Sequence, residues 1–108
     1  IAHQALDLHN PKTSRNVSGY LPHERAWFSD YLALGLADAL RTLQPEAPEL
    51  YTWFSYRFRG REKNKGWRLD YHLASTPLLP HVADYRLHSA VEFSDHVPVE
   101  LVLSLPAH

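Results

Sequence analysis

Hydrophobic and polar positions alternate along the chain in a way that first indicates one helix. Between residues 22 and 34 the apolar side chains recur near every third or fourth position, while Pro22 and Glu24 suit the first turn of a helix. This pattern predicts a helix over residues 22–34, which Gly35 can end, with its apolar face packed in the core. That face consists of Trp27, Phe28, Tyr31, Leu32 and Leu34.

The rest of the chain predicts short elements separated by turns. Residues 36–43 fit either a short helix or a strand. Residues 51–58 are rich in aromatic side chains, and residues 67–75 alternate, so both are expected to be strands. A short strand is expected within residues 82–91 and a final strand over residues 97–105. One helical turn is expected around Leu78 and Leu79, between prolines.

The alternation in residues 67–75 isolates one carboxylate. A two-residue period places Asp70 with Arg68 and His72 on one side, opposite an apolar side that begins with Trp67. Because burial of an unpaired carboxylate is unfavourable, Asp70 needs a partner. From the residues alone two interpretations stay open: a structural salt bridge to an arginine, or a place in a catalytic site.

Composition narrows the class of protein. The 108 residues suffice for one domain, and 44% hydrophobic with 21% charged residues is ordinary for a soluble globular protein. No apolar run approaches the ~18 residues of a membrane span, and no signal peptide is expected. The absence of cysteine excludes disulfides and thiolate zinc sites.

The net charge of −1 hides an asymmetry. Residues 57–68 contain six cations and one anion, so this segment has a formal charge of +5 and the rest of the chain −6. Such a segment indicates a local anionic partner, and the alternative is a solvated basic turn. Its charged residues are Arg57, Arg59, Arg61, Glu62, Lys63, Lys65 and Arg68.

Two motifs have the residue types of a phosphodiester-cutting site. They are Gly66-Trp67-Arg68-Leu69-Asp70-Tyr71 and Ser94-Asp95-His96-Val97-Pro98. In such sites one carboxylate serves the metal ion, a histidine contacts the phosphate, and a second carboxylate orients the histidine. An isolated Asp-His pair is common, so the combination and order of the motifs make the signal specific.

The chain resembles the exonuclease III-type apurinic/apyrimidinic endonucleases of the endonuclease/exonuclease/phosphatase superfamily. The resemblance runs through nearly the whole chain, in order and at matching spacings. Besides the two motifs, it rests on Asp7-Leu8-His9-Asn10-Pro11-Lys12, Gly19-Tyr20, Pro22-x-Glu24-Arg25, Tyr51-Thr52-Trp53-Phe54-Ser55-Tyr56 and Arg61-x-Lys63-Asn64-x-Gly66-Trp67. Phe93 and Val97 depart from the family pattern, which usually has glycine and often cysteine there.

The resemblance implies a role for each catalytic candidate. His96 matches the catalytic histidine that contacts the scissile phosphate, and Asp70 matches the aspartate that orients it. Asp95 matches the aspartate beside the metal ion, which it would bind directly or through water. Mg²⁺, or alternatively Mn²⁺, is the implied cofactor.

The resemblance also implies the DNA-binding surface. Trp53, Trp67 and Leu69 match the apolar pocket for a flipped-out abasic sugar, although core packing is the alternative for both tryptophans. Arg57 falls where the family places a side chain that probes the DNA. The remaining basic residues of the loop, expected to contact phosphates, are Arg59, Arg61, Lys63 and Lys65.

The implied fold is α/β, in the α+β sense: half of a DNase I-like four-layer α/β sandwich, a mostly antiparallel sheet with covering helices. Residues 1–108 match its C-terminal portion only, beginning after the family's central Gly-Asp-x-Asn motif. The family residues that activate the attacking water lie upstream of this point. We therefore expect a fragment that is inactive or very weak alone, and that associates with itself or with an N-terminal half.

The function implied is a DNA-repair phosphodiesterase that, when complete, incises double-stranded DNA 5′ to abasic sites and acts as a 3′-5′ exodeoxyribonuclease. The expected compartment is the bacterial cytoplasm and nucleoid, or the nucleus in a eukaryote, with no membrane partner. Three alternatives stay open: another phosphoesterase of the superfamily, a non-catalytic DNA-binding module, and a structural remnant without a ligand.

Overall fold

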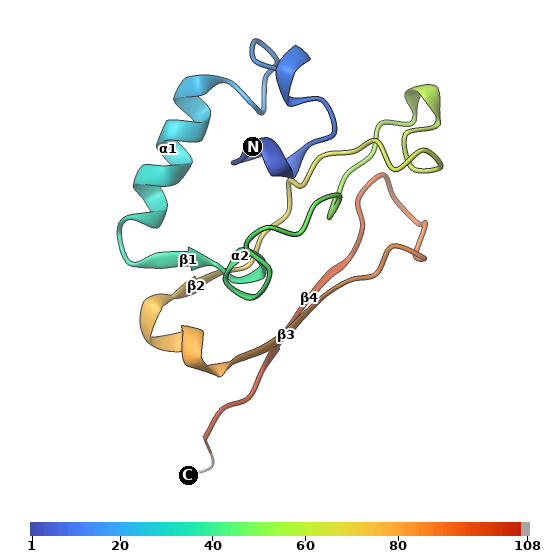
Figure 1. Ribbon diagram of the computed structural model, residues 1–108. Helices are drawn as coiled ribbons and strands as arrows, with labels where there is room; N and C mark the ends of the chain where they lie inside the picture. The colour runs from blue at the N-terminus through green and yellow to red at the C-terminus, as the bar shows by residue number, and fades with distance from the viewer. Residues whose placement is uncertain (107–108) are drawn as a thin grey trace.

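The computed structural model describes residues 1–106, and its helices and strands are short (Figure 1). None of the helices in these residues has the length and apolar character needed to span a membrane. The elements are α1 (Pro22–Leu32), β1 (Leu36–Asp38), α2 (Ala39–Leu43), β2 (Leu73–Ser75), β3 (Val82–Leu87) and β4 (Val99–Leu103). Single 3-10 turns lie at Ala5–Asp7, Pro11–Thr13 and Arg57–Arg59, and a longer one at Thr76–His81.

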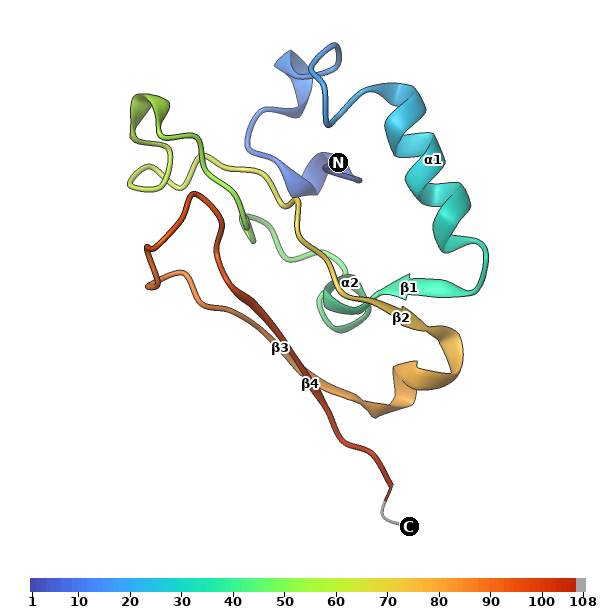
Figure 2. The same cartoon turned by 180° about the vertical axis from the view of Figure 1, so that it is seen from behind.

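The strands form two separate antiparallel pairs. β1 pairs with β2, with Leu36 opposite Ser75, and β3 pairs with β4, with Leu87 opposite Val99. In Figures 1 and 2 the β3–β4 ribbon runs diagonally along one side, α1 lies on the other, and the N-terminal segment lies between them. The molecule is flat and elongated, with extents of 51 × 33 × 21 Å.

The predicted helix is confirmed, but its predicted packing is wrong. α1 begins at Pro22 as expected and ends at Leu32, and Gly35 follows in the left-handed region with φ of 105°. Of the predicted apolar face only Phe28 is buried. Trp27 and Tyr31 stack on each other at 5.4 Å between ring centroids and stay exposed, because they lie one turn apart on the outer face. Leu34 is exposed beyond the helix end.

The ambiguous segment 36–43 contains both elements that its pattern allowed. β1 leads directly into α2 at Asp38. The Asp38 side chain accepts a hydrogen bond from the Arg41 amide at 3.4 Å, the usual arrangement at a helix N-cap. The remaining elements, β3, β4 and the 3-10 turn at Thr76–His81, fall within the expected ranges.

The two central strands are where the sequence prediction fails most. Residues 51–58 form only isolated bridges at Trp53 and then a 3-10 turn, and of residues 67–75 only β2 is regular strand. The ladder is interrupted because the Thr52 hydroxyl, not a backbone carbonyl, accepts from the Leu69 and Asp70 amides at 2.8 and 3.1 Å. Asp70 therefore lies in irregular chain and not in mid-strand.

Arg68 is the second reason why residues 67–75 do not form a continuous strand. Its position also corrects the prediction that all the cations of residues 57–68 form one charged segment. Its side chain is fully buried and does not belong to the charged surface. Arg68 Nε donates to Asp7 Oδ1 at 2.8 Å, Nη1 donates to Asp38 Oδ1 at 3.0 Å, and Nη2 donates to Asp38 Oδ2. Burial alone would lower the pKa of the guanidinium, but the hydrogen bonds and negative charges of its two aspartate partners outweigh burial and raise the pKa of Arg68.

The ion cluster formed by Arg68, Asp7 and Asp38 ties three distant segments together. The 3-10 turn before Leu8 supplies Asp7, the β1–α2 junction supplies Asp38, and Arg41 of α2 adds a bond to Asp7 Oδ1 at 2.7 Å. Burial alone would raise the pKa of the Asp7 carboxyl, but hydrogen bonds and positive charge from Arg68 and Arg41 leave it lowered. The cluster is buried alongside the hydrophobic residues of the core, which include Leu40 and Trp67.

We predict that Arg68→Met, which keeps most of the side-chain volume, lowers the free energy of unfolding by about 3–5 kcal/mol, because two buried carboxylates lose their partner. Urea denaturation followed by circular dichroism measures the change. Arg59→Met is the control, since the exposed Arg59–Glu62 pair at 3.9 Å should contribute within about 0.5 kcal/mol. A loss below ~1 kcal/mol in Arg68→Met would show that the cluster is not structurally important.

Acid should weaken the same cluster. Because the pKa of Asp7 is lowered in the folded state, its contribution is complete above the unfolded pKa of about 3.9 and is lost as the pH falls through the lower folded value. Asp7→Asn removes this titrating group, so the stability gap between wild type and variant should narrow from pH 6 towards pH ~3. Urea midpoints across that range test this; a constant gap would contradict it.

Candidate functional site

Three segments meet where the two sequence motifs come together. Trp53 forms antiparallel bridges to both Trp67 and His96, with paired backbone hydrogen bonds of 2.9 Å between Trp53 and Trp67. On the other side, the Phe54 amide donates to the Asp95 carbonyl at 3.0 Å and the Val97 amide to the Thr52 carbonyl at 2.6 Å. The aromatic run thus lies between the motifs and holds both in register.

This arrangement brings together the acid and the histidine predicted to act as a pair. His96 Nδ1 lies 2.8 Å from Asp70 Oδ2, although the residues are 26 positions apart. A carboxylate can only accept, so Nδ1 carries the proton and Nε2 is the ring nitrogen left for a ligand. About half of the His96 side chain is exposed, so the ring lies at the surface.

Thr52 positions this pair and was missed by the sequence analysis. Its side chain is fully buried, and its hydroxyl accepts a hydrogen bond from the Asp70 amide, which fixes the backbone at that residue. Its carbonyl holds Val97, the residue after His96. The sequence signal was weak: a single polar, β-branched residue in a run of aromatics is usual for a strand.

Asp95 is set by a different neighbour. The Trp53 indole Nε1 donates to Asp95 Oδ2 at 3.0 Å, and the Ser94 hydroxyl donates to Oδ1 at 3.2 Å. The indole hydrogen bond is the main cause of a lowered pKa for the Asp95 carboxyl. Asp95 is therefore held as an oriented carboxylate at neutral pH.

The residues predicted to form the sugar pocket line one cavity of about 200 Å³. Trp53, Trp67 and Leu69 share it with Ile1 and residues 17–19. The cavity is smaller than the ~300–1,000 Å³ of sites for drug-sized ligands, so a group of about one sugar suits it better. Gly19 (φ 97°) keeps it open at one wall, since a Cβ there would lie 3.1 Å from the Trp67 ring.

The residues present offer one carboxylate to a metal ion. Within residues 1–106 no group of three or more acidic, histidine or cysteine side chains is placed to hold one. Asp95 alone stands in the predicted position, with both oxygens already hydrogen-bonded within the chain. A divalent cation would need further ligands from water or from outside these residues.

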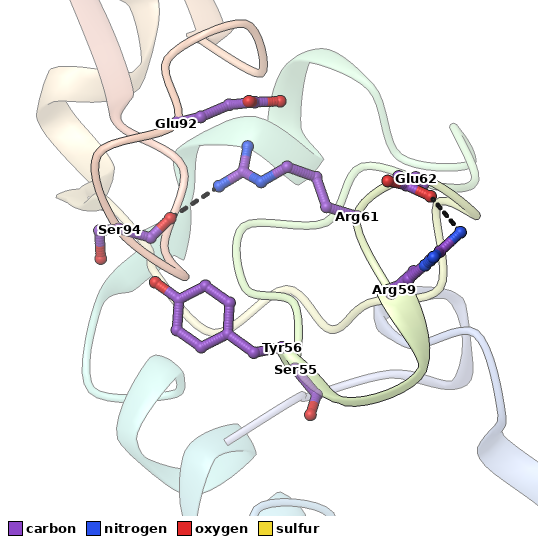
Figure 3. Close-up of a pocket in the computed structure, with 8 residues that line it drawn as sticks. Ser55, Tyr56, Arg59, Arg61, Glu62, Glu92 and Ser94 are labelled. Atoms are coloured by element: carbon purple, nitrogen blue, oxygen red, sulfur yellow. Dashed lines mark hydrogen bonds and ion pairs between the residues drawn. The ribbon is translucent and has the colours of Figure 1, made fainter.

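The basic residues divide between two cavities. One, of about 290 Å³, is lined by Arg57, Lys63 and Lys65 together with His9 and Ser55. The other, of about 330 Å³, includes Arg59 and Arg61 and is shown in Figure 3. There Arg59 faces Glu62 at the rim, whereas Arg61 reaches across the cavity to Ser94. The loop is not one uniform basic surface.

We predict that Trp53→Phe raises the pKa of the Asp95 carboxyl towards its ordinary value, because the variant removes the indole donor and keeps an aromatic ring. Carbon-detected NMR of the aspartate carboxyls against pH measures it. Trp67→Phe is the matched control, since Trp67 lines the same cavity without bonding Asp95. An unchanged titration of Asp95 in Trp53→Phe would remove the assigned cause.

Comparison with known proteins supports the resemblance seen in the motifs. A DNA repair nuclease, APEX1, from Danio rerio is 41% identical over 105 residues, which cover 97% of this chain and 34% of that protein. An exodeoxyribonuclease from Bacillus subtilis is 40% identical over 105 residues, which cover 97% of this chain and 42% of that protein. The chain thus spans well under half the length of these curated relatives.

The fold is shared as well. The crystal structure of the AP endonuclease LMAP from Leishmania major superposes with a TM-score of 0.94 at 33% identity, covering 98% of this chain and 33% of that one. This confirms the expected α/β fold and its extent as a fragment of such enzymes. The model of the Endonuclease/Exonuclease/phosphatase family matches residues 1–96, nine tenths of the chain. The chain belongs to the endonuclease/exonuclease/phosphatase family.

Proposed function

We propose that this chain is the C-terminal portion of a DNA-repair phosphodiesterase that incises double-stranded DNA 5′ to an abasic site and also acts as a 3′-5′ exodeoxyribonuclease. The observation that supports it most is the double position of Trp53. Its indole holds Asp95 beside His96, and its ring lines the sugar-sized cavity. A phosphate at the acid–histidine group and a sugar in the cavity would then be neighbours on one strand.

His96 would act on the scissile phosphate. With Nδ1 donating to Asp70, Nε2 can donate to a phosphate oxygen when the ring is protonated or accept a proton when it is neutral. Asp70 fixes the orientation of the ring, while Thr52 fixes the backbone at Asp70. The chain thus supplies an oriented, partly exposed imidazole for phosphate chemistry.

Asp95 would hold Mg²⁺, or Mn²⁺ in its place, directly or through water. A bound Mg²⁺ polarises a phosphoryl oxygen and offsets the charge that develops there. Because magnesium commonly retains several waters and takes only one or two carboxylates, a single aspartate is an acceptable contribution. The remaining ligands and the group that activates water would come from outside these residues.

The cavity would select abasic DNA by size. A nucleotide without a base is easily extruded from the helix, and the cavity of about 200 Å³ leaves little room for an intact base beside the sugar. Lys63 and Lys65 line one cationic cavity with Arg57, which would probe the DNA, and these two lysines would contact the phosphate backbone. They would position the duplex without reading its sequence.

The partner that completes the site would be an N-terminal half, in the same protein or as a separate chain, with self-association as the other arrangement. Residues 1–108 would be the C-terminal portion of one endonuclease/exonuclease/phosphatase domain. If the protein acts on genomic DNA, its compartment would be the bacterial cytoplasm and nucleoid, or the nucleus in a eukaryote.

We predict that Mg²⁺-dependent incision of a duplex with one abasic site, measured with the chain mixed with an N-terminal half of the family, falls roughly 10²-fold or more in His96→Ala. His88→Ala is the matched control: His88 Nε2 also lies 3.0 Å from a carboxylate, Glu100 Oε1, but on the surface of the β3–β4 ribbon. Equal activity of His96→Ala and wild type would refute the assignment. Hydrolysis of soluble phosphoesters without DNA binding would favour a different phosphoesterase of the family.

A further inference from the structure

Arg61 differs from the other basic residues of its loop in how its guanidinium is used. Nη1 donates to the Ser89 carbonyl at 3.1 Å and to the Val91 carbonyl at 3.4 Å, and Nη2 donates to the Ser94 carbonyl at 2.9 Å. Figure 3 shows the side chain extended towards Ser94, with Glu92 on the loop above it. Arg61 thus spans most of the loop that joins β3 to β4, of which residues 88–96 are hereafter called the 88–96 loop.

The two ends of the 88–96 loop are held by other contacts, but its middle, residues 89–94, has few. Most of its residues are exposed, and Phe93 is 97% exposed. Its backbone makes one turn, in which the Val91 amide donates to the His88 carbonyl at 3.0 Å. Loops with few buried apolar contacts open at low free energy, so an added anchor has a large effect on their geometry. This loop ends in Asp95 and His96.

A second contact links Arg61 to the same residues. Its guanidinium carbon lies 5.3 Å from the centre of the Phe54 ring, and the Phe54 amide donates to the Asp95 carbonyl at 3.0 Å. Arg61 therefore contacts the carbonyl just before Asp95 and the ring of the residue that binds the carbonyl of Asp95. The two contacts therefore act on the two peptide units that flank Asp95.

The neighbouring cations are placed differently. The Arg59 side chain is 79% exposed and its contact with Glu62 is 3.9 Å long. Arg57, Lys63 and Lys65 are exposed and line the other cavity. The Arg61 guanidinium already uses three of its five N–H donors on carbonyls, so it keeps fewer for a phosphate than the exposed cations do.

We propose that Arg61 is a positioning residue and not a DNA contact: it fixes the 88–96 loop so that Asp95 and His96 stay in place against Trp53 and Asp70. Arginine suits this role because its planar fork carries donors on separate nitrogens, whereas the three donors of a lysine ammonium radiate from one nitrogen. Its catalytic consequence rests on the proposed function, but its effect on the geometry of the loop does not.

The first arm of the test measures geometry in the chain without DNA. Arg61→Lys keeps the charge of the side chain. Arg59→Lys is the matched control, because it makes the same change two residues earlier in the chain. We expect Arg61→Lys to shift the NMR resonances of the Asp95 amide and the His96 ring and to speed hydrogen exchange at the His96 amide. Arg59→Lys should leave them at their wild-type values. Unmoved Asp95 and His96 signals in Arg61→Lys would overturn the proposal.

The second arm measures DNA binding against salt, with a duplex carrying one abasic site. Loss of a phosphate contact lowers the slope of log affinity against log salt by about one. We expect this in Arg59→Ala and not in Arg61→Ala; a lowered slope in Arg61→Ala would make it a phosphate contact and overturn the proposal. If Arg61→Ala does not fold, the resonances of Arg61→Lys decide alone.

The third arm separates this inference from the proposed function. In the complemented enzyme, Arg61→Lys should lower kcat on the order of 10²-fold with little change in KM, as expected when reacting groups shift by about 1 Å. Unchanged kcat in an active enzyme would overturn the catalytic consequence. If the wild type cleaves no DNA, the proposed function fails, while the NMR comparison still decides whether Arg61 positions the loop.

Discussion

The fold depends on a buried arginine held between two aspartates. Arg68 and Asp7 have no exposed side-chain surface and Asp38 has almost none, so the cluster lies in the interior of a small, flat molecule. Removing such charges from water is unfavourable, and only the full set of charge-assisted hydrogen bonds offsets it. A cluster of this kind tolerates one geometry. The N-terminal turn, the β1–α2 junction and the central segment must therefore adopt a single mutual arrangement.

The site inherits its geometry from that arrangement. Arg68 lies between Trp67 and Leu69, which line the small cavity, and it is two residues before Asp70. Its backbone amide donates to the Asp7 carbonyl at 2.6 Å, so main chain and side chain are fixed to the same partner. With Arg68 pointing inward, the residues on either side turn towards the cavity. The Thr52 hydroxyl then accepts hydrogen bonds from the amides of Leu69 and Asp70, which fixes the backbone at the aspartate that contacts His96.

The sequence predicted the features that depend on local patterns or on motif order, and it failed where contacts between distant residues decide the structure. α1 was found because helix periodicity and the turn at Gly35 are local properties. The contact between Asp70 and His96 was found through the order and spacing of two motifs, which a family resemblance preserves. The central strands were mispredicted because a threonine hydroxyl replaced the backbone acceptor, and no local pattern reports such a substitution. The exposed Trp27–Tyr31 stack was mispredicted because helical spacing cannot tell which apolar face meets the core.

The basic segment shows the same limit for charge. Counting cations in residues 57–68 treats Arg59, Arg61 and Arg68 alike, yet one is exposed, one anchors a loop and one is buried in an ion cluster. The difference lies in the acceptors each guanidinium meets, which come from residues far away in the sequence. The positive charge of this segment predicted an anionic partner for all of its cations, whereas in the structure only the exposed cations are free to meet such a partner. The other two arginines act on the protein itself. Arg68 fixes the segment that leads to Asp70, and Arg61 fixes the loop that leads to Asp95 and His96.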